Sequence, residues 1–322
     1  MSNQALPTTV NNPSNASPAT DLSKITRPDR VANYFDLARK SSVVMQLARK
    51  VPLGLAGNEI VVQTGKATAS WVAEAGQKPT TSSDLGLKSF KPHKIAAISV
   101  VSAEVVRANP GNYMDVLQAD IAEAFAVAFD NAVLHGTSTP FGAYIDQTTK
   151  TVELGTTAKA DGGTYGDIVA GLKTIVTSKN SLGYYRKLNG FVFDKSIEPT
   201  FLGAVDTVGR PLFSNATYEA GQTVTPGAII GRPALLGDNV ATAVVTGTPN
   251  TGGIVGYGGD WSQIVWGQIG GITFDVSTET SVTLNGTLTS LWEHNLVAVR
   301  AETEFGILIN DIDSFVTFTD NT

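Results

Sequence analysis

The clearest periodic pattern in the chain predicts a long amphipathic helix over residues 110–136. Apolar side chains recur there every three or four residues, which at 100° per residue places them on one face of a helix. Asn112 can cap this helix, and Gly136 is well placed to end it. The predicted apolar face consists of Met114, Leu117, Ile121, Phe125, Ala128 and Ala132, and the opposite face carries Glu123 and Asp130. We expect a rod of ~33 Å with one face on a sheet and an acidic face toward something else.

Earlier in the chain, two strand-like segments enclose a long polar stretch. Residues 59–63 and 93–102 are rich in β-branched and other apolar side chains, whereas the residues between them show little helical period. A loop of that length is usually functional when it occurs in a compact protein. We predict an extended hairpin, called here the flap (residues 59–95), with the lone aromatic Trp71 in its middle. An exposed aromatic side chain of this kind can anchor a partner, and Trp71 packed against its own subunit is the alternative.

The second half of the chain predicts further helices and a late sheet. A glycine-rich run at 252–259 is expected to be a mobile loop that ends at Asp260 and Trp261, and residues 262–318 alternate as strands do. The smaller elements expected are a helix at 164–179 with Asp167 in its capping box, a strand at 190–193, a short helix at 196–202 and an apolar segment at 229–237. The fold class predicted is α+β.

The charges divide unevenly along the chain. Residues 1–112 hold 13 Lys and Arg against 7 Asp and Glu, a balance of +6, and residues 113–322 hold 10 against 22, a balance of −12. Only 16% of all residues are charged, against about 25% in a typical soluble domain. We therefore expect much uncharged surface that partners cover, and a basic N-terminal part that meets an acidic body in the same molecule or a neighbour. A simple drift in composition is the alternative.

Most kinds of active site lack their residues here. The chain has no cysteine, which excludes disulfide scaffolds, zinc fingers, iron–sulfur clusters and thiol nucleophiles. His93, His135 and His294 have no histidine four positions away, and neither a P-loop nor a GxSxG motif occurs. The acidic balance argues against a dedicated nucleic-acid binder. We predict no catalytic, cofactor-binding or metal-binding residue, no cofactor, no secretory signal and no membrane-spanning helix.

The parts that remain suit a protein whose work is to hold copies of itself. A flap can reach a neighbouring copy and lengthen its sheet or cover its core. The residues we name as candidates for contacts between subunits are Arg39, Lys40, Lys66, Trp71, Glu74, Lys78, Glu123, Asp130, Tyr257, Asp260 and Trp261.

An ordered series of short segments resembles the Hong Kong 97-type major capsid protein family of tailed bacteriophages. No single segment is highly specific, but the series spans roughly residues 30–320 in family order. The segments are SSVVMQLARKVPLG (41–54), WVAEAGQKPTTSS (71–83), KIAAISVVSAEVV (94–106), LHGTSTPFG (134–142), NGFVFDKS (189–196), VGRPLF (208–213), GRPALLGDNV (231–240), GDWSQIVWG (259–267) and LVAVRAETEFGILINDIDSFVTFT (296–319).

The resemblance implies the Hong Kong 97-type capsid fold, with a long spine helix, an extended E-loop hairpin, and peripheral and axial domains. The implied parts are an N-terminal arm at 1–57, the E-loop at 58–95, a peripheral domain at 96–160 with the spine helix at 113–135, an axial domain at 161–284, and a return to the peripheral domain at 285–322. The glycine-rich loop, near 246–261, is expected where subunits converge on the pentamer and hexamer axes.

The function implied is that of a major capsid protein. Copies form the pentamers and hexamers of an icosahedral shell that encloses double-stranded DNA. The protein is expected to contact this DNA non-specifically. Scaffolding, portal and decoration proteins are the further partners, no membrane is involved, and assembly takes place in the host cytoplasm before the protein resides in the virion. An encapsulin-like compartment shell is the nearest alternative. An α+β enzyme without a recognisable motif and a secreted adhesin, which the missing signal disfavours, are the others.

Overall fold

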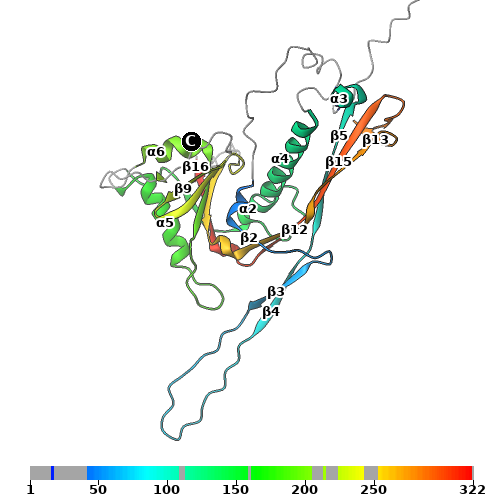
Figure 1. Ribbon diagram of the computed structural model, residues 1–322. Helices are drawn as coiled ribbons and strands as arrows, with labels where there is room; N and C mark the ends of the chain where they lie inside the picture. The colour runs from blue at the N-terminus through cyan, green and yellow to red at the C-terminus, as the bar shows by residue number, and fades with distance from the viewer. Residues whose placement is uncertain are drawn as a thin grey trace, which may run out of the picture. The chain divides into compact units, whose positions relative to one another are not determined.

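The computed structural model describes residues 16–17, 42–108, 113–158, 161–204, 213–214, 224–242 and 253–320. The chain forms both helices and strands, and beyond residue 203 the described elements are strands and short 3-10 helices (Figure 1). The helices are α2 (Val43–Leu47), α3 (Ala103–Ala108), α4 (Tyr113–Leu134), α5 (Thr164–Val176) and α6 (Glu198–Gly203), with short 3-10 helices η2 (Ile145–Gln147), η4 (Lys195–Ile197), η5 (Trp261–Gln263) and η6 (Ile312–Ser314). The strands are β1 (Ala16–Ser17), β2 (Arg49–Lys50), β3 (Asn58–Gln63), β4 (Leu85–Phe90), β5 (His93–Ser102), β6 (Thr151–Glu153), β7 (Gly190–Asp194), β8 (Phe213–Ser214), β9 (Thr225–Ile229), β10 (Arg232–Gly237), β11 (Gly253–Gly259), β12 (Ile264–Ser277), β13 (Ser281–Leu284), β14 (Thr287–Ser290), β15 (Leu296–Ile309) and β16 (Phe315–Asp320).

The chain folds into two compact units. The first consists of Lys94–Ala124 and Gly270–Glu304, together with the N-terminal Met1–Leu37, of which only β1 is described. The second consists of Ala38–His93, Phe125–Ile269 and Phe305–Thr322. Helix α4 and strands β5, β12 and β15 contribute residues to both units. The three strands belong to a five-stranded sheet in the order β1-β5-β15-β12-β2.

The first unit is built on strand β5. Neighbouring residues in a strand point to opposite faces, so Val100 and Val101 enter different cores. Val100 packs with Leu284, Leu291 and Ala298. Val101 packs with the buried Val105 and with the partly buried Val106, Tyr113 and Leu117. The sheet in this unit is therefore covered on both faces.

The second unit is built on a seven-stranded sheet in the order β6-β16-β11-β7-β10-β9-β8. Helix α5 lies against this sheet (Figure 1), and Gly171 lets it approach closely, since a Cβ there would stand 2.5 Å from the ring of Phe318. Buried Asp167 accepts hydrogen bonds from Gly155 N and Thr157 N, which ties the preceding loop to α5. The core beneath contains Leu154, Ile168, Ile175, Leu188, Phe191, Phe193, Ile197, Phe201, Ile229, Ala234, Leu236, Val316 and Phe318.

The predicted long helix is confirmed as α4, and Gly136, at φ +69°, follows its end. Asn112 lies outside the described residues. The predicted apolar face is right for Ile121, Phe125 and Ala132, which are buried. It is wrong for Ala128, which is exposed. The buried side extends instead to Phe129, Asp130, Val133 and Leu134, so the C-terminal half of α4 is covered over a wider arc than a single stripe.

The pairing within the flap differs from the prediction. Strand β3 pairs in antiparallel register with β4, from Asn58 opposite Phe90 to Gln63 opposite Leu85. The segment at 93–102 is strand β5, as predicted, but it belongs to the five-stranded sheet. The β4 segment escaped notice because Gly86, Lys88 and Ser89 interrupt its apolar residues, although Leu85 and Leu87 alternate with Gly86 and Lys88 as in a strand.

The glycine-rich run is not a mobile loop. Residues 253–259 form β11, which lies between β16 and β7 in the seven-stranded sheet, while residue 252 lies outside the described residues. A Cβ at Gly256 would meet the ring of Phe193, and one at Gly259 would meet the ring of Phe315. These glycines are therefore required because large aromatic side chains from neighbouring strands occupy the space above them.

Candidate interaction surfaces

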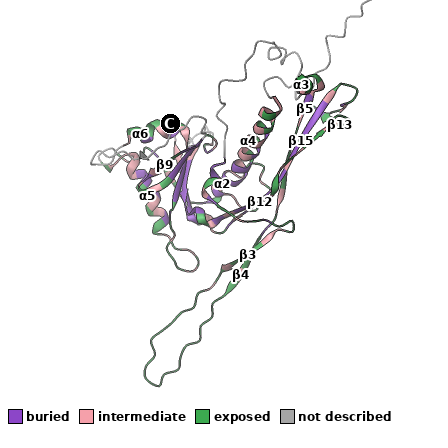
Figure 2. Cartoon of the chain, in the orientation of Figure 1, coloured by how far each residue is buried: buried purple, intermediate pink, exposed green. Residues whose placement is uncertain are grey.

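The tip of the flap is the most exposed part of the described chain. Every residue from 66 to 85 is exposed (Figure 2). Trp71 is as open to solvent as in an extended peptide. The two sides of the flap are joined by a few hydrogen bonds, in which Thr68 N donates to Thr81 Oγ1 at 2.8 Å and Gly65 N donates to Asp84 O at 3.1 Å. Because this stretch contributes almost nothing to a core, stability of the subunit alone does not explain its length.

The contact candidates Lys66, Trp71, Glu74 and Lys78 all lie on this exposed stretch. The structure does not bring them into one cluster with the other candidates. Lys66 has a partner within the chain, because its ammonium group stands 4.9 Å from the centre of the Tyr184 ring.

The root of the flap is fixed to the second unit. Lys88 Nζ donates a hydrogen bond to the carbonyl oxygen of Asn310 at 2.6 Å. Phe90 is buried, and a Cβ at Gly306 would stand 3.1 Å from its ring. Gly57, at φ +87°, lets the chain turn where a Cβ would collide with the carbonyl oxygen of Phe90. The flap therefore begins from a defined position on its own subunit.

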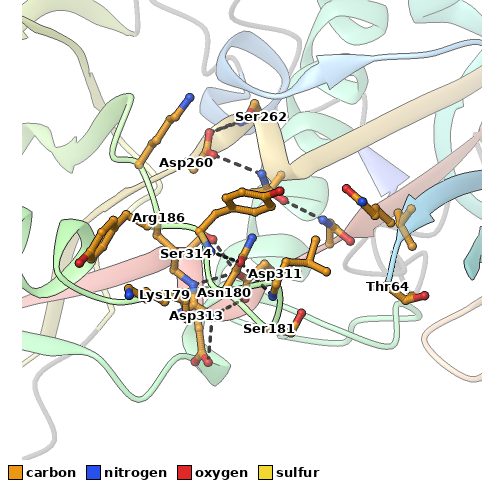
Figure 3. Close-up of a pocket in the computed structure, with 18 of the residues that line it drawn as sticks. Thr64, Lys179, Asn180, Ser181, Arg186, Asp260, Ser262, Asp311, Asp313 and Ser314 are labelled. Carbon is orange, nitrogen blue, oxygen red and sulfur yellow. Dashed lines mark hydrogen bonds and ion pairs between the residues drawn. The ribbon is translucent and has the colours of Figure 1, made fainter. Parts of the chain in front are cut away.

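A polar cavity of about 1020 Å³ lies beside this root (Figure 3). Val62, Thr64 and Lys88 line one side, and the loop at 179–189 together with residues 260–263 and 310–314 lines the rest. Its floor holds a forked ion pair in which Arg186 Nε and Nη2 donate to the two carboxylate oxygens of Asp311 at 2.7 and 3.1 Å.

The charges of this cavity are largely satisfied within it. Partial burial by itself raises the pKa of Asp311, but the hydrogen bonds from Arg186 and Ser314 outweigh burial and hold this pKa below its ordinary value. Asp313 stands 3.5 Å from Arg186 Nη2, and Asp260 accepts hydrogen bonds from Asn189 and Ser262. The Arg186–Asp311 pair could not be recognised from the sequence, because 125 positions separate its members.

Asp130 is a buried structural residue rather than part of an exposed acidic face, so that prediction is wrong. It is 1% exposed, and its carboxylate accepts hydrogen bonds from Ser42 Oγ at 2.6 Å, Val43 N at 2.9 Å and Val44 N at 3.3 Å. Ser42 in turn caps α2 by accepting from Met45 N. Asp130 lies on α4 and accepts hydrogen bonds from N–H groups in the first turn of α2, which would otherwise be unsatisfied. These bonds attach α2 to the side of α4.

The ionisation of Asp130 is strongly affected by this position. Burial raises its pKa from 3.8 to about 6, and the hydrogen bonds from Ser42, Val43 and Val44 together with the nearby His135 oppose the rise.

A second polar cluster closes the C-terminal end of α4. Tyr257 OH donates to Asp146 Oδ1 at 2.6 Å and lies 2.9 Å from His135 Nδ1, which is 3.1 Å from Asp146 Oδ2. Burial, and then the charge of Asp146, raises the pKa of the Tyr257 phenol well above its ordinary value, which keeps the hydroxyl protonated as a donor. The cluster ties the C-terminal end of α4 to η2 and β11, and these parts all belong to the second unit.

Three further candidates are buried within the subunit. Tyr257 and Trp261 are almost completely covered, and Asp260 is 8% exposed. Trp261 Nε1 donates to Gly190 O at 3.1 Å, and Asp260 caps η5 through Ser262 N. The structure thus places Tyr257 and Trp261 in the core, whereas Asp260 borders the polar cavity.

The remaining candidates are Glu123, Arg39 and Lys40. Glu123 is half-buried on α4, near the exposed Asp120. Arg39 and Lys40 lie outside the described residues.

Among the residues that the structure describes, no group of three or more His, Asp or Glu side chains is placed to hold a metal ion. No described helix is both long and apolar enough to cross a bilayer.

Comparison with known proteins relates most of this chain to one family. The sequence profile of the Phage capsid family matches residues 25–320. The probable major capsid protein gp17 of Mycobacterium phage L5 is 41% identical over 302 residues, which cover 91% of this chain and 88% of that protein. Its counterpart in Mycobacterium phage D29 is 43% identical over 300 residues, which cover 91% of this chain and 89% of that protein.

Solved structures from other phages have a similar fold. A solved structure from Gordonia phage Cozz superposes with a TM-score of 0.68 at 26% identity, with 94% of each chain covered. One from Mycobacterium phage Bobi superposes with a TM-score of 0.70 at 17% identity, covering 95% of this chain and 99% of that chain.

Proposed function

The chain belongs to the phage capsid family, and from this membership we propose that it forms the pentamers and hexamers of an icosahedral shell around double-stranded DNA. It is a major capsid protein of the Hong Kong 97 type, a structural protein of the phage virion rather than an enzyme. Copies of it assemble with one another into oligomeric shells. The family relationship replaces the alternatives of a compartment shell, an enzyme or an adhesin.

The observation that carries the proposed assembly role is the contrast between the two ends of the flap. Its root is fixed by Lys88 and Phe90, whereas residues 66–85 have no cover within the described chain. A long exposed segment held in one direction is suited to lie over a neighbouring copy. Trp71, Glu74 and Lys78 are proposed to contact that neighbour, with Trp71 supplying the large apolar area typical of such anchors.

The proposed division of labour follows the family architecture. Residues 1–57 form the N-terminal arm, 58–95 the E-loop, 96–160 and 285–322 the peripheral domain with its spine helix, and 161–284 the axial domain. Assembly in the host cytoplasm, with scaffolding, portal and decoration proteins as partners, is part of the same proposal.

Charge is proposed to guide both assembly and packaging. The N-terminal balance of +6 attracts the acidic bodies of neighbouring copies, so assembly should weaken as salt screens this attraction. The exposed Asp115 and Asp120 and the half-buried Glu123 keep one side of α4 acidic. If that side lines the interior, it repels DNA and lets the duplex slide during packaging.

A truncated flap tests the assembly role without disturbing the root. Gly65 and Asp84 are already joined by a hydrogen bond of 3.1 Å, so residues 66–83 can be replaced by the two-residue turn Asn-Gly. We expect folded subunits or capsomers with unchanged circular dichroism, but no closed shells by electron microscopy. The control is Ser82→Ala, which keeps the length of the flap. Closed shells of normal size from the truncated protein would refute the role of the flap.

A further inference from the structure

The two faces of the β3–β4 hairpin differ in exposure, and the fully exposed face carries Glu59, Val61, Gln63, Leu85, Leu87 and Ser89. In its antiparallel register Val61 lies opposite Leu87 and Gln63 lies opposite Leu85, so these four side chains share one face. Val61, Leu87 and Leu85 are 60%, 63% and 70% exposed. We call these three residues the apolar stripe. They form a contiguous apolar group on an open surface, unlike single exposed apolar residues, which are ordinary.

The opposite face of the hairpin is already occupied. It carries Ile60, Val62, Lys88 and Phe90, which are half-buried or buried. Lys88 is hydrogen-bonded to Asn310 O, and Val62 and Lys88 border the polar cavity. This face therefore belongs to the subunit's own body.

The stripe needs a cover for a physical reason. An isolated two-stranded ribbon is at best marginally stable in water, and this hairpin forms a sheet of β3 and β4 alone. The face with Ile60, Val62, Lys88 and Phe90 is attached to the body, while the apolar stripe on the other face has no cover in the part of the chain described. Burial of that face is favourable and would also hold the direction of the flap.

We propose that the apolar stripe of Val61, Leu85 and Leu87 is the surface through which the flap docks on a second copy of this chain. The occupant is a second copy because self-assembly is what this chain does, and the stripe adjoins the exposed residues 66–85. The proposal rests on the proposed role of the flap and adds which of its surfaces makes the contact. The stripe is buried in shells and exposed in free subunits.

The absence of cysteine from the sequence makes a direct test simple. Leu87→Cys introduces a single thiol, which is labelled with benzophenone maleimide in free subunits, and the labelled protein is then assembled and irradiated. We expect cross-linked dimers of this chain in shells and mainly monomers in unassembled protein, with the attachment peptide identified by mass spectrometry. Ile60→Cys, on the opposite face of the same hairpin, is the matched control and should give no dimers.

Ser82→Cys, at the exposed tip but outside the stripe, separates the two proposals. Dimers from Ser82→Cys without dimers from Leu87→Cys would overturn the stripe and leave the role of the flap intact. Dimers from neither variant would overturn both. Cross-links from Leu87→Cys that stay within one chain, or that capture a different protein, would also overturn the stripe as a self-contact.

A second variant measures the contribution of the stripe to assembly. Leu87→Lys places a charge on an exposed position, so the subunit should fold as before. We expect it to raise the protein concentration needed for shells by about tenfold or more, the factor that corresponds to losing one buried leucine at an interface. Ser82→Lys adds the same charge nearby and should leave that concentration unchanged. An equal threshold for wild type and Leu87→Lys would overturn the proposal.

Discussion

Removal of the Asp130 carboxylate tests the buried link between α2 and α4. Asp130→Ala leaves the backbone amides of Val43 and Val44 without their acceptor, and the hydroxyl of Ser42 loses its partner as well. A buried donor left unsatisfied costs about 1–3 kcal/mol. We therefore expect the free energy of unfolding at pH 7 to fall by about 2–4 kcal/mol.

The pH dependence of this loss has a definite sign. The pKa of Asp130 rises from 3.8 to about 6 on folding, because burial disfavours the charged form. The folded state therefore holds its proton more tightly than the unfolded state. This contribution to stability is fully present below pH 3.8 and is lost as the pH rises through about 6. The difference between wild type and Asp130→Ala should thus be about 1 kcal/mol larger at pH 5 than at pH 7.

Urea unfolding of unassembled full-length subunits, followed by tryptophan fluorescence, measures the loss of unfolding free energy at pH 7 and its change between pH 7 and pH 5. Trp261 and Trp266 are buried and report on the second unit. Other titrating groups cancel in the difference between variant and wild type. Gln118→Ala, at an exposed position of α4, is the control and should change stability by no more than about 0.5 kcal/mol at either pH. A loss from Asp130→Ala that is smaller at pH 5 than at pH 7 would show that burial does not control this carboxyl group.

Two other substitutions separate core from surface. Gly256→Ala should destabilise the subunit by about 1–3 kcal/mol, because the new methyl group meets the ring of Phe193 in a packed sheet, and thermal unfolding of free subunits measures this; an unchanged melting temperature would contradict the packing argument. Trp71→Ala should leave the unfolding free energy within about 0.5 kcal/mol of wild type, since the side chain is fully exposed, yet reduce the yield of shells in sedimentation assays. A full yield of shells would remove Trp71 from the contact.

The sequence was informative where structure depends on nearby residues. Helix α4 follows from its own periodicity, and the exposed flap follows from a polar stretch too long for a turn. The burial of Asp130 could not be read locally, because its partner Ser42 lies 88 positions away and only the tertiary fold brings them together.

Predictions from composition were wrong where residues far apart in the sequence determine the packing. The glycines of β11 suggested mobility, but their neighbours Phe193 and Phe315 come from other strands. The same holds for the apolar stripe, whose members are unremarkable singly and share a face only through the register of β3 and β4. Local pattern thus predicts elements, whereas register and long-range pairing determine which surfaces they present.

The glycine strand also has an evolutionary consequence. A larger residue at Gly256 or Gly259 is accommodated only if the phenylalanine above it shrinks, so each glycine and its aromatic partner must change together or not at all. A substitution of the glycine alone produces a steric clash, and a substitution of the phenylalanine alone by a smaller residue leaves a cavity. We therefore expect these glycine and phenylalanine positions to change rarely among related capsid proteins, and in pairs where they do.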